Sequence, residues 1–197
     1  MTADAGDPHD GVVDGGRGES RSEARRRVVL VGFMGCGKTV VGSLLAQRLD
    51  WPLVDLDARI EASAGRSIPE IFAHQGEAAF RDLEHDELRR ALEPQSQVIA
   101  TGGGAFIAER NRTLLEGRAT SFWLDPGFDT LLARLTPEER AHRPLFRDPA
   151  TARALYRERA PIYALADHRV DVAESETAIR VAARIESLIR DSEPHKH

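Results

Sequence analysis

The segment Gly32–Thr39 carries the residue types that bind a phosphate chain. Its sequence, GFMGCGKT, matches G-x-x-x-x-G-K-[ST], whose glycines let backbone N–H groups turn toward phosphate oxygens. In such a loop Lys38 reaches the β- and γ-phosphates, and the Thr39 hydroxyl is available to Mg²⁺. We therefore predict a P-loop that binds a nucleoside triphosphate through Gly35, Cys36, Gly37, Lys38, Thr39 and Val40.

Two carboxylates follow in the predicted second strand, Pro52–Asp57. Because strand residues two apart share a face, Asp55 and Asp57 are expected to project the same way, at the end where α/β sheets bind ligands. The third predicted strand ends in glycine, where many P-loop proteins place a metal-holding Asp. Asp55 is therefore our candidate for holding Mg²⁺, through a water molecule. Asp57 is our candidate for the base that takes the proton from a hydroxyl group of the acceptor. The alternative is a strand-end turn with solvated acids.

Three consecutive glycines, Gly102, Gly103 and Gly104, follow the predicted strand Val98–Thr101. Glycines directly after a strand indicate that another group approaches the backbone closely.

Arginines recur where ligands are expected, at Arg81, Arg134, Arg140, Arg143, Arg147 and Arg159. One arginine alone is usually a solvated surface residue, but several near a P-loop suit two anions, a triphosphate and a carboxylate-bearing acceptor. Arg143 and Arg159 are the stronger candidates. Glu84 lies one helical turn after Arg81 and is expected to hold its guanidinium in place.

The elements around these motifs alternate between strand and helix. Further strands are predicted at Val28–Val31, Ala119–Leu124 and Arg169–Val172, with helical patterns between them. This alternation indicates one α/β domain, a parallel sheet with helices on both faces, over residues 28–190. We expect a disordered arm over residues 1–27, a mobile lid over about 136–150 and a flexible tail over 191–197.

The composition narrows the class of protein further. A net charge of -5 and a pI near 5.8 argue against general nucleic-acid binding, and no apolar stretch is long enough for a membrane span. The N-terminus is acidic where a signal peptide would be basic, and the single cysteine excludes an intrachain disulfide. We expect a cytoplasmic monomer, with Cys36 as a small filler or, alternatively, a redox-sensitive thiol.

A P-loop alone does not identify the reaction. The chain has no H-R-D-x-x-x-x-N and no D-F-G, which excludes a protein kinase. The remaining class is a small-molecule kinase of the nucleoside-monophosphate-kinase type.

The same residues, taken together, resemble the shikimate kinases. The resemblance runs from about Val28 to Ile189, and its most specific segments are VDLD, GEAAFRDLE and GGG, in that order. It implies ATP-dependent phosphorylation of the shikimate 3-hydroxyl, as in chorismate and aromatic amino acid biosynthesis, and a three-layer fold with strand order 2-3-1-4-5.

The resemblance also implies roles for single residues. Asp57 would bind acceptor hydroxyls and serve as base, Arg81 and Arg159 would bind the shikimate carboxylate, and Glu84 would orient Arg81. Gly102, Gly103 and Gly104 would bind the acceptor, with Gly103 and Gly104 lying against its ring. On the nucleotide side, Arg143 would touch the transferring phosphate, and Arg134 and Arg169 would flank the adenine.

Two alternatives stay open at this point. A kinase for another polyol acid, such as gluconate, would need a different acceptor pocket. A catalytically silent nucleotide-binding module is disfavoured because Lys38, Asp57 and Arg143 are all intact.

Overall fold

The computed structural model describes residues 26–134 and 148–192. Residues 1–25 of the predicted arm, residues 136–147 of the predicted lid and residues 193–197 of the predicted tail lie outside the described residues. Arg140, Arg143 and Arg147 belong to that undescribed segment, so their predicted roles have no structural counterpart here.

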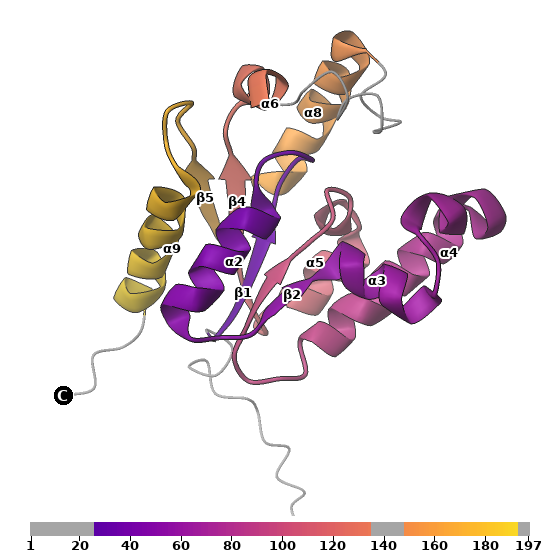
Figure 1. The fold of residues 1–197 in the computed structure, drawn as a ribbon, viewed down its shortest axis with the longest axis horizontal. Coiled ribbons are helices and arrows are strands. Elements are labelled where there is room, and N and C mark those ends of the chain that lie inside the picture. The colour runs from indigo at the N-terminus through magenta and orange to yellow at the C-terminus, as the bar shows by residue number, and fades with distance from the viewer. Residues whose placement is uncertain (1–25, 135–147, 193–197) are drawn as a thin grey trace, which may run out of the picture.

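A five-stranded parallel sheet forms the centre of the molecule (Figure 1). Its strands are β1 (Arg27–Val31), β2 (Leu53–Asp55), β3 (Gln97–Ala100), β4 (Thr120–Asp125) and β5 (His168–Asp171). They lie in the order β2-β3-β1-β4-β5, which confirms the predicted fold class and strand order. Every residue of β1 and β3 is buried, because a parallel sheet covered on both faces needs continuous apolar strands.

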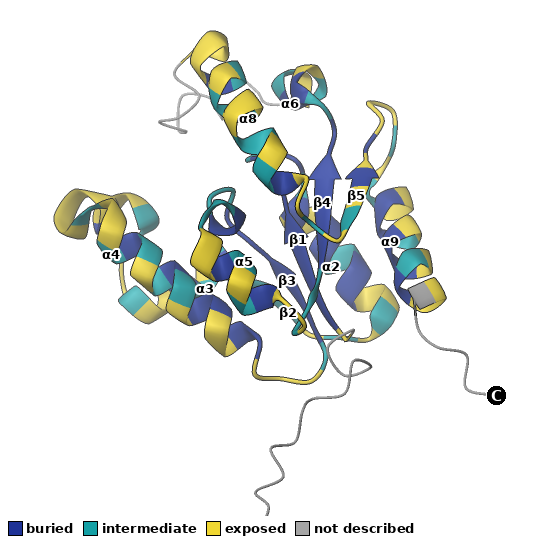
Figure 2. Cartoon of the chain, turned by 180° about the vertical axis from the view of Figure 1, so that it is seen from behind, coloured by how far each residue is buried: buried dark blue, intermediate teal, exposed yellow. Residues whose placement is uncertain are grey.

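Helices cover both faces of this sheet. Helix α2 (Lys38–Leu49) packs against α9 (Ala178–Ser192) in front of it, and Figure 2 shows α5 (Glu109–Leu115) on the other side. The remaining helices are α3 (Leu56–Ala64), α4 (Ile68–Ala91), η1 (Ala105–Ile107), α6 (Phe128–Arg134) and α8 (Pro149–Tyr163). Within the described ranges, no helix is both long and apolar enough to span a membrane.

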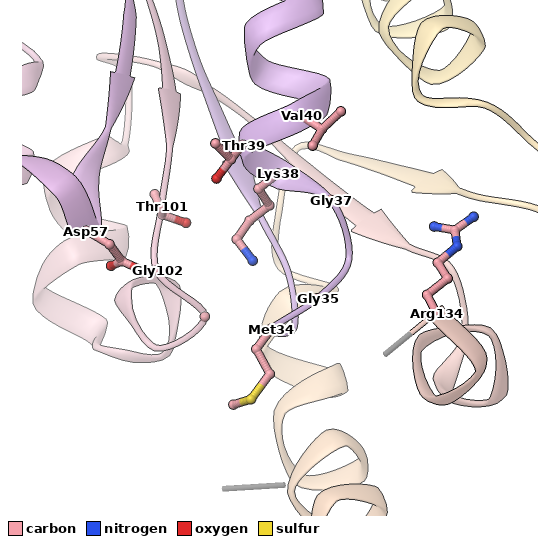
Figure 3. A pocket seen from close by; sticks show the side chains of 11 residues that line it. Met34, Gly35, Gly37, Lys38, Thr39, Val40, Asp57, Thr101, Gly102 and Arg134 are labelled. Carbon is pink, nitrogen blue, oxygen red and sulfur yellow. The ribbon is translucent and has the colours of Figure 1, made fainter. Parts of the chain in front are cut away.

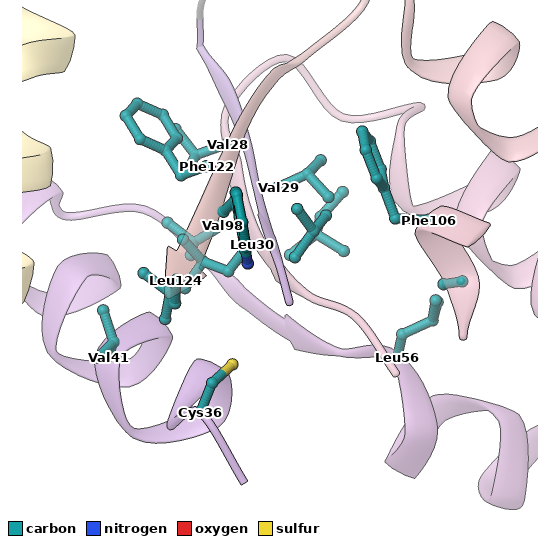
Figure 4. Close-up of a cluster of buried hydrophobic side chains, with 14 of the residues drawn as sticks. Val28, Val29, Leu30, Cys36, Val41, Leu56, Val98, Phe106, Phe122 and Leu124 are labelled. Carbon is teal, nitrogen blue, oxygen red and sulfur yellow. The ribbon is translucent and has the colours of Figure 1, made fainter. Parts of the chain in front are cut away.

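The hydrophobic core lies between the sheet and these helices (Figure 4). Leu30 and Phe122, from neighbouring strands, have no exposed surface. Cys36 belongs to the same cluster and is only 2% exposed, so its side chain fills space beneath the P-loop. Because parallel strands end at one edge, this core fixes the carboxyl ends of β1, β2 and β3 beside one another.

The second strand is shorter than predicted, and this corrects the argument that placed the two aspartates. Strand β2 ends at Asp55, and helix α3 begins at Leu56. The Asp55 carboxylate accepts a hydrogen bond of 3.2 Å from the Ala58 N–H and so caps the helix, a role for which aspartate is well suited. Asp57 therefore lies in the first turn of α3, and strand alternation does not relate it to Asp55.

Helix α4 contains a break at Gly76, whose φ of 80° and ψ of 174° are not helical. Ser67 is the N-cap of the first part, and the Glu70 carboxylate accepts hydrogen bonds from both the N–H and the hydroxyl of Ser67. Side chains other than glycine are strained in the backbone conformation of Gly76. Glu77 consequently starts a new helical segment, the one that carries Arg81 and Glu84.

Helix α9 offers a matched test of where the core lies. Ile185 has no exposed surface and Ile179 is 60% exposed, so the same truncation can be made twice on one helix. We expect Ile185→Ala to lower the free energy of unfolding by about 2–5 kcal/mol and Ile179→Ala to change it by less than about 0.5 kcal/mol. Urea unfolding followed by circular dichroism measures both. Equal losses for the two variants would contradict the packing described here.

Candidate active site

A cleft of about 330 Å³ opens at the carboxyl ends of the central strands. Its lining combines the P-loop with residues that follow β2 and β3 and with the end of α6: Met34, Gly35, Gly37, Lys38, Thr39, Val40, Asp57, Thr101, Gly102, Gly103 and Arg134. Figure 3 shows Asp57 and Gly102 on one side of the P-loop and Arg134 on the other. The structure thus brings together most of the predicted nucleotide-binding residues and the predicted base.

The P-loop owes its shape to glycines in the left-handed region. Gly32, Gly35 and Gly37 have φ values of 136°, 80° and 96°. At Gly32 a side chain is also excluded by space, because a Cβ there would lie 2.7 Å from the Leu124 carbonyl oxygen. The loop ends where α2 begins, so the positive end of the helix dipole faces the cleft.

Lys38 is 8% exposed and folds back over the P-loop. Its Nζ donates to the carbonyl oxygens of Gly32 at 2.9 Å and Phe33 at 3.0 Å. Its third contact is with Cys36 Sγ at 3.6 Å, and a thiol sulfur is only a weak acceptor. Two fixed carbonyls thus hold the charge at the position where a phosphate would be bound.

The predicted metal-side pair is in direct contact. The Thr39 hydroxyl donates to Asp55 Oδ2 at 2.7 Å, while Oδ1 of the same carboxylate caps α3. Asp55 therefore ties the first turn of α2 to the start of α3. The two side chains present adjacent oxygen atoms of the hard type that Mg²⁺ prefers.

Asp57 lies against the backbone of Gly102. A Cβ on Gly102 would come within 2.5 Å of Asp57 Oδ1, so only glycine leaves room for this carboxylate. Burial is the largest influence on Asp57 and raises its pKa above the ordinary value of 3.8; Lys38 opposes this shift and Asp55 adds to it. The result is a carboxylate that is more basic than a solvated one.

Arg81 lies beside the last glycine of the same loop. A Cβ on Gly104 would come within 2.8 Å of Arg81 Nη2, so the guanidinium packs directly on the glycine backbone. Its Nη1 donates to both oxygens of Glu84, at 3.1 and 3.0 Å, as predicted for that pair. Glu84 is only 1% exposed, and burial raises the pKa of its carboxyl in spite of the nearby Arg81 charge.

The middle glycine is held from the other side by α8. The Gly103 carbonyl accepts a hydrogen bond of 2.5 Å from the Tyr163 hydroxyl and one of 3.4 Å from Arg159 Nη1. A Cβ on Gly103 would lie 3.2 Å from the Met34 nitrogen, so this residue also adjoins the P-loop. Arg159 therefore reaches the loop that carries Asp57 and Arg81, although it does not line the cleft itself.

The two arginines predicted to flank the adenine differ in their surroundings. Arg134 lines the cleft, and its Nη2 donates to the Ala173 carbonyl at 3.3 Å. Arg169 does not line it, because its guanidinium pairs with Asp125 at 2.8 Å and Asp171 at 2.9 Å, over the Trp123 ring.

Sequence reasoning missed Asp125 as an organising residue. Its buried carboxylate accepts from the Tyr156 hydroxyl at 2.6 Å and the Gly127 N–H at 3.1 Å, in addition to Arg169. No motif marks it, and its place at the end of β4 was the only available signal. Thr101, which also lines the cleft, and Tyr163 were likewise not predicted as site residues.

The fold and the cleft together define a P-loop kinase for a small molecule. The P-loop is of the phosphate-binding type, and a carboxylate with a raised pKa and an arginine line the same cleft. Comparisons with known proteins specify the family.

The family model described as shikimate kinase matches residues 34–190. Shikimate kinase of Ruegeria pomeroyi is 46% identical over 171 residues, which cover 85% of this chain and 84% of that protein. Shikimate kinase of Cereibacter sphaeroides is 44% identical, with 84% and 83% covered. The chain therefore belongs to the shikimate kinase family, as the resemblance in sequence predicted.

Solved structures agree with this assignment. Shikimate kinase from Acinetobacter baumannii, in complex with shikimate, superposes with a TM-score of 0.78 and 32% identity, over 85% of this chain and 94% of that one. Shikimate kinase from Aquifex aeolicus gives a TM-score of 0.73 and 33% identity, over 84% and 96%.

The Gly102–Asp57 contact predicts a catalytic defect from one added methyl group. In Gly102→Ala the new Cβ must displace the Asp57 carboxylate, and a shift of about 1 Å in a reacting group can lower kcat about 100-fold. We expect that loss with the KM for ATP changed less than about twofold. Steady-state kinetics of Gly102→Ala, Asp57→Asn and the double variant test the cause. If the two losses multiply in the double variant, Gly102 does not act through Asp57.

The raised pKa of Asp57 predicts opposite effects on activity and stability. A base must be ionised, so the acidic limb of the kcat/KM profile should lie above pH 3.8. A carboxyl whose folded-state pKa is raised stabilises the fold most below its unfolded-state pKa, and that contribution is lost as pH rises through the folded-state value.

Asp57→Asn should therefore have a higher Tm than the wild type at pH 7, with a difference that shrinks toward pH 4, together with a loss of about 10²–10⁴-fold in turnover. Thermal unfolding across this pH range measures the first effect. A lower Tm for Asp57→Asn at pH 7 would contradict the dominance of burial.

Proposed function

We propose that this chain transfers the γ-phosphoryl group of ATP to the 3-hydroxyl of shikimate. The observation that carries the proposal is the loop Gly102–Gly104. Its successive residues stand against Asp57, the P-loop backbone at Met34, and Arg81. One rigid segment thereby sets the distance between a base, a phosphate site and a carboxylate site, as transfer to a small carboxylate-bearing alcohol requires.

Each residue has a defined task in this proposal. Lys38 and the P-loop N–H groups hold the phosphates, while Asp57 orients the acceptor hydroxyl and takes its proton as the new P–O bond forms. Arg81 and Arg159 bind the acceptor carboxylate, with Glu84 behind Arg81. The assignment of Arg143 to the transferring phosphate rests on the family resemblance alone.

The residues at this site fit Mg²⁺ as the bound metal. Thr39 and Asp55 would hold it, the latter through water, since both offer oxygen atoms at the mouth of the P-loop. A bound Mg²⁺ ion would neutralise charge on the phosphate oxygens.

The proposal also covers the adenine, the assembly state and the compartment. Arg134, at the far side of the cleft, would flank the adenine, with Arg169 held beside it by Asp125. A monomer suffices, because a single chain supplies both the P-loop and the Gly102–Gly104 loop. The single cysteine, free and buried, suits the cytoplasm.

A coupled ADP-release assay tests the proposed reaction directly. With ATP and Mg²⁺, shikimate should give fast ADP release, and gluconate, quinate or no acceptor should give only background. Release that is independent of the acceptor would overturn the assigned substrate. ATP binding without any release would instead support a silent nucleotide-binding module.

Arg159 offers a matched test of the acceptor side. Arg159→Ala should raise the KM for shikimate by about tenfold or more, since hydrogen bonds to charged groups contribute about 1.5–3 kcal/mol. The KM for ATP should change less than about twofold. The control is Arg157→Ala, two residues earlier on α8 and exposed, which should leave both constants unchanged. A change confined to the KM for ATP would assign Arg159 to the nucleotide side.

A further inference from the structure

The guanidinium of Arg81 is already paired with two carboxylates, and its side chain is 26% exposed. Glu84 occupies Nη1 through both of its oxygens. Glu77 Oε1 accepts from Nη2 at 3.1 Å and from Nε at 3.3 Å, so it occupies the opposite, forked edge. A carboxylate that binds arginine in the bidentate way needs such an edge.

Two further groups lie against the guanidinium. The Phe80 ring lies under Arg81, with Cζ 5.1 Å from its centroid. The Gly104 backbone packs against Nη1 and Nη2. An acceptor carboxylate can therefore take the forked edge of Arg81, formed by Nε and Nη2, only by displacing Glu77.

Burial decides which group can leave. The Glu84 side chain is 1% exposed, and moving it away from Arg81 would strand a buried carboxylate. The Glu77 side chain is 67% exposed and can rotate into water. It also follows the break at Gly76, so it stands in the first turn of a helical segment, where the helix dipole favours a carboxylate that has no partner.

We propose that the Glu77 carboxylate is an internal stand-in for the carboxylate of the acceptor. It keeps the forked edge of Arg81 paired while the site is empty, and an anionic acceptor displaces it. Binding is then an exchange of one carboxylate for another at Arg81, so Glu77 sets the affinity for the acceptor without touching the reacting atoms. This inference rests on the proposed function, in which Arg81 binds the acceptor carboxylate.

The size of the effect follows from exposure. An ion pair with one largely exposed partner contributes little, so its removal should strengthen acceptor binding by about two- to fivefold. The affinity for ATP should not change, because Glu77 does not line the cleft around the P-loop.

The test compares Glu77→Gln with Asp82→Asn. Both remove one negative charge from α4 at similar exposure, 67% and 70%, but Asp82 pairs with Arg110 instead of Arg81. We expect Glu77→Gln to lower the KM for shikimate about two- to fivefold, with kcat and the KM for ATP unchanged. Calorimetric titration with shikimate in the absence of nucleotide should show the same gain, and Asp82→Asn should match the wild type.

Ionic strength gives a second, independent readout. In the wild type one ion pair replaces another, whereas in Glu77→Gln binding forms an additional pair that salt screens. The KM for shikimate should therefore rise more steeply with salt in Glu77→Gln than in the wild type or in Asp82→Asn.

The inference is overturned if Glu77→Gln raises the KM for shikimate, leaves it unchanged, or changes it only as much as Asp82→Asn does. Arg81→Ala separates this failure from failure of the proposed function. If Arg81→Ala weakens shikimate binding and Glu77→Gln has no effect, only the stand-in is wrong. If the wild type does not phosphorylate shikimate, the proposed function itself is wrong.

Discussion

The absence of side chains at Gly102, Gly103 and Gly104 is the constraint on which the site depends. Asp57, the P-loop and Arg81 come from three different parts of the chain, and each packs against a different one of these glycines. A Cβ at the first or third position would collide with a charged group. Because the loop has no side chains, it allows the P-loop, Asp57 and Arg81 to approach one another closely. In the proposed reaction, this closeness sets the separation between the phosphate site and the acceptor site.

Helix α8 supports this loop from the other side. Tyr163 and Arg159 both donate to the Gly103 carbonyl, and Tyr156, two turns earlier, donates to the buried Asp125 at the end of β4. One helix thus connects the acceptor loop to the nucleotide side of the sheet.

The sequence was sufficient for the fold class and for most of the cleft, because the P-loop and the glycine run are local patterns with local causes. The strand order came from resemblance, since periodicity carries no information on it. Asp57 lines the cleft, as expected from its place after a strand end, but the argument from strand alternation was wrong, because Asp55 ends the strand by capping α3. Asp125 and Glu77 escaped prediction because their roles arise only from long-range contacts or from the break at Gly76.

Charge compensation before any ligand arrives explains why such a crowded site remains folded. Arg81 forms ion pairs with Glu84 and Glu77, and Lys38 donates hydrogen bonds to two backbone carbonyls. Both cations therefore have partners within the protein. The burial of Asp57 outweighs the attraction of Lys38 and raises its pKa. Burial likewise raises the pKa of Glu84, so its cost falls on these two carboxylates, while Arg81 and Lys38 are held by internal partners. Under the exchange proposed for Arg81, an anionic acceptor replaces the internal carboxylate of Glu77, so selectivity depends on how well the two carboxylates compete for the same guanidinium.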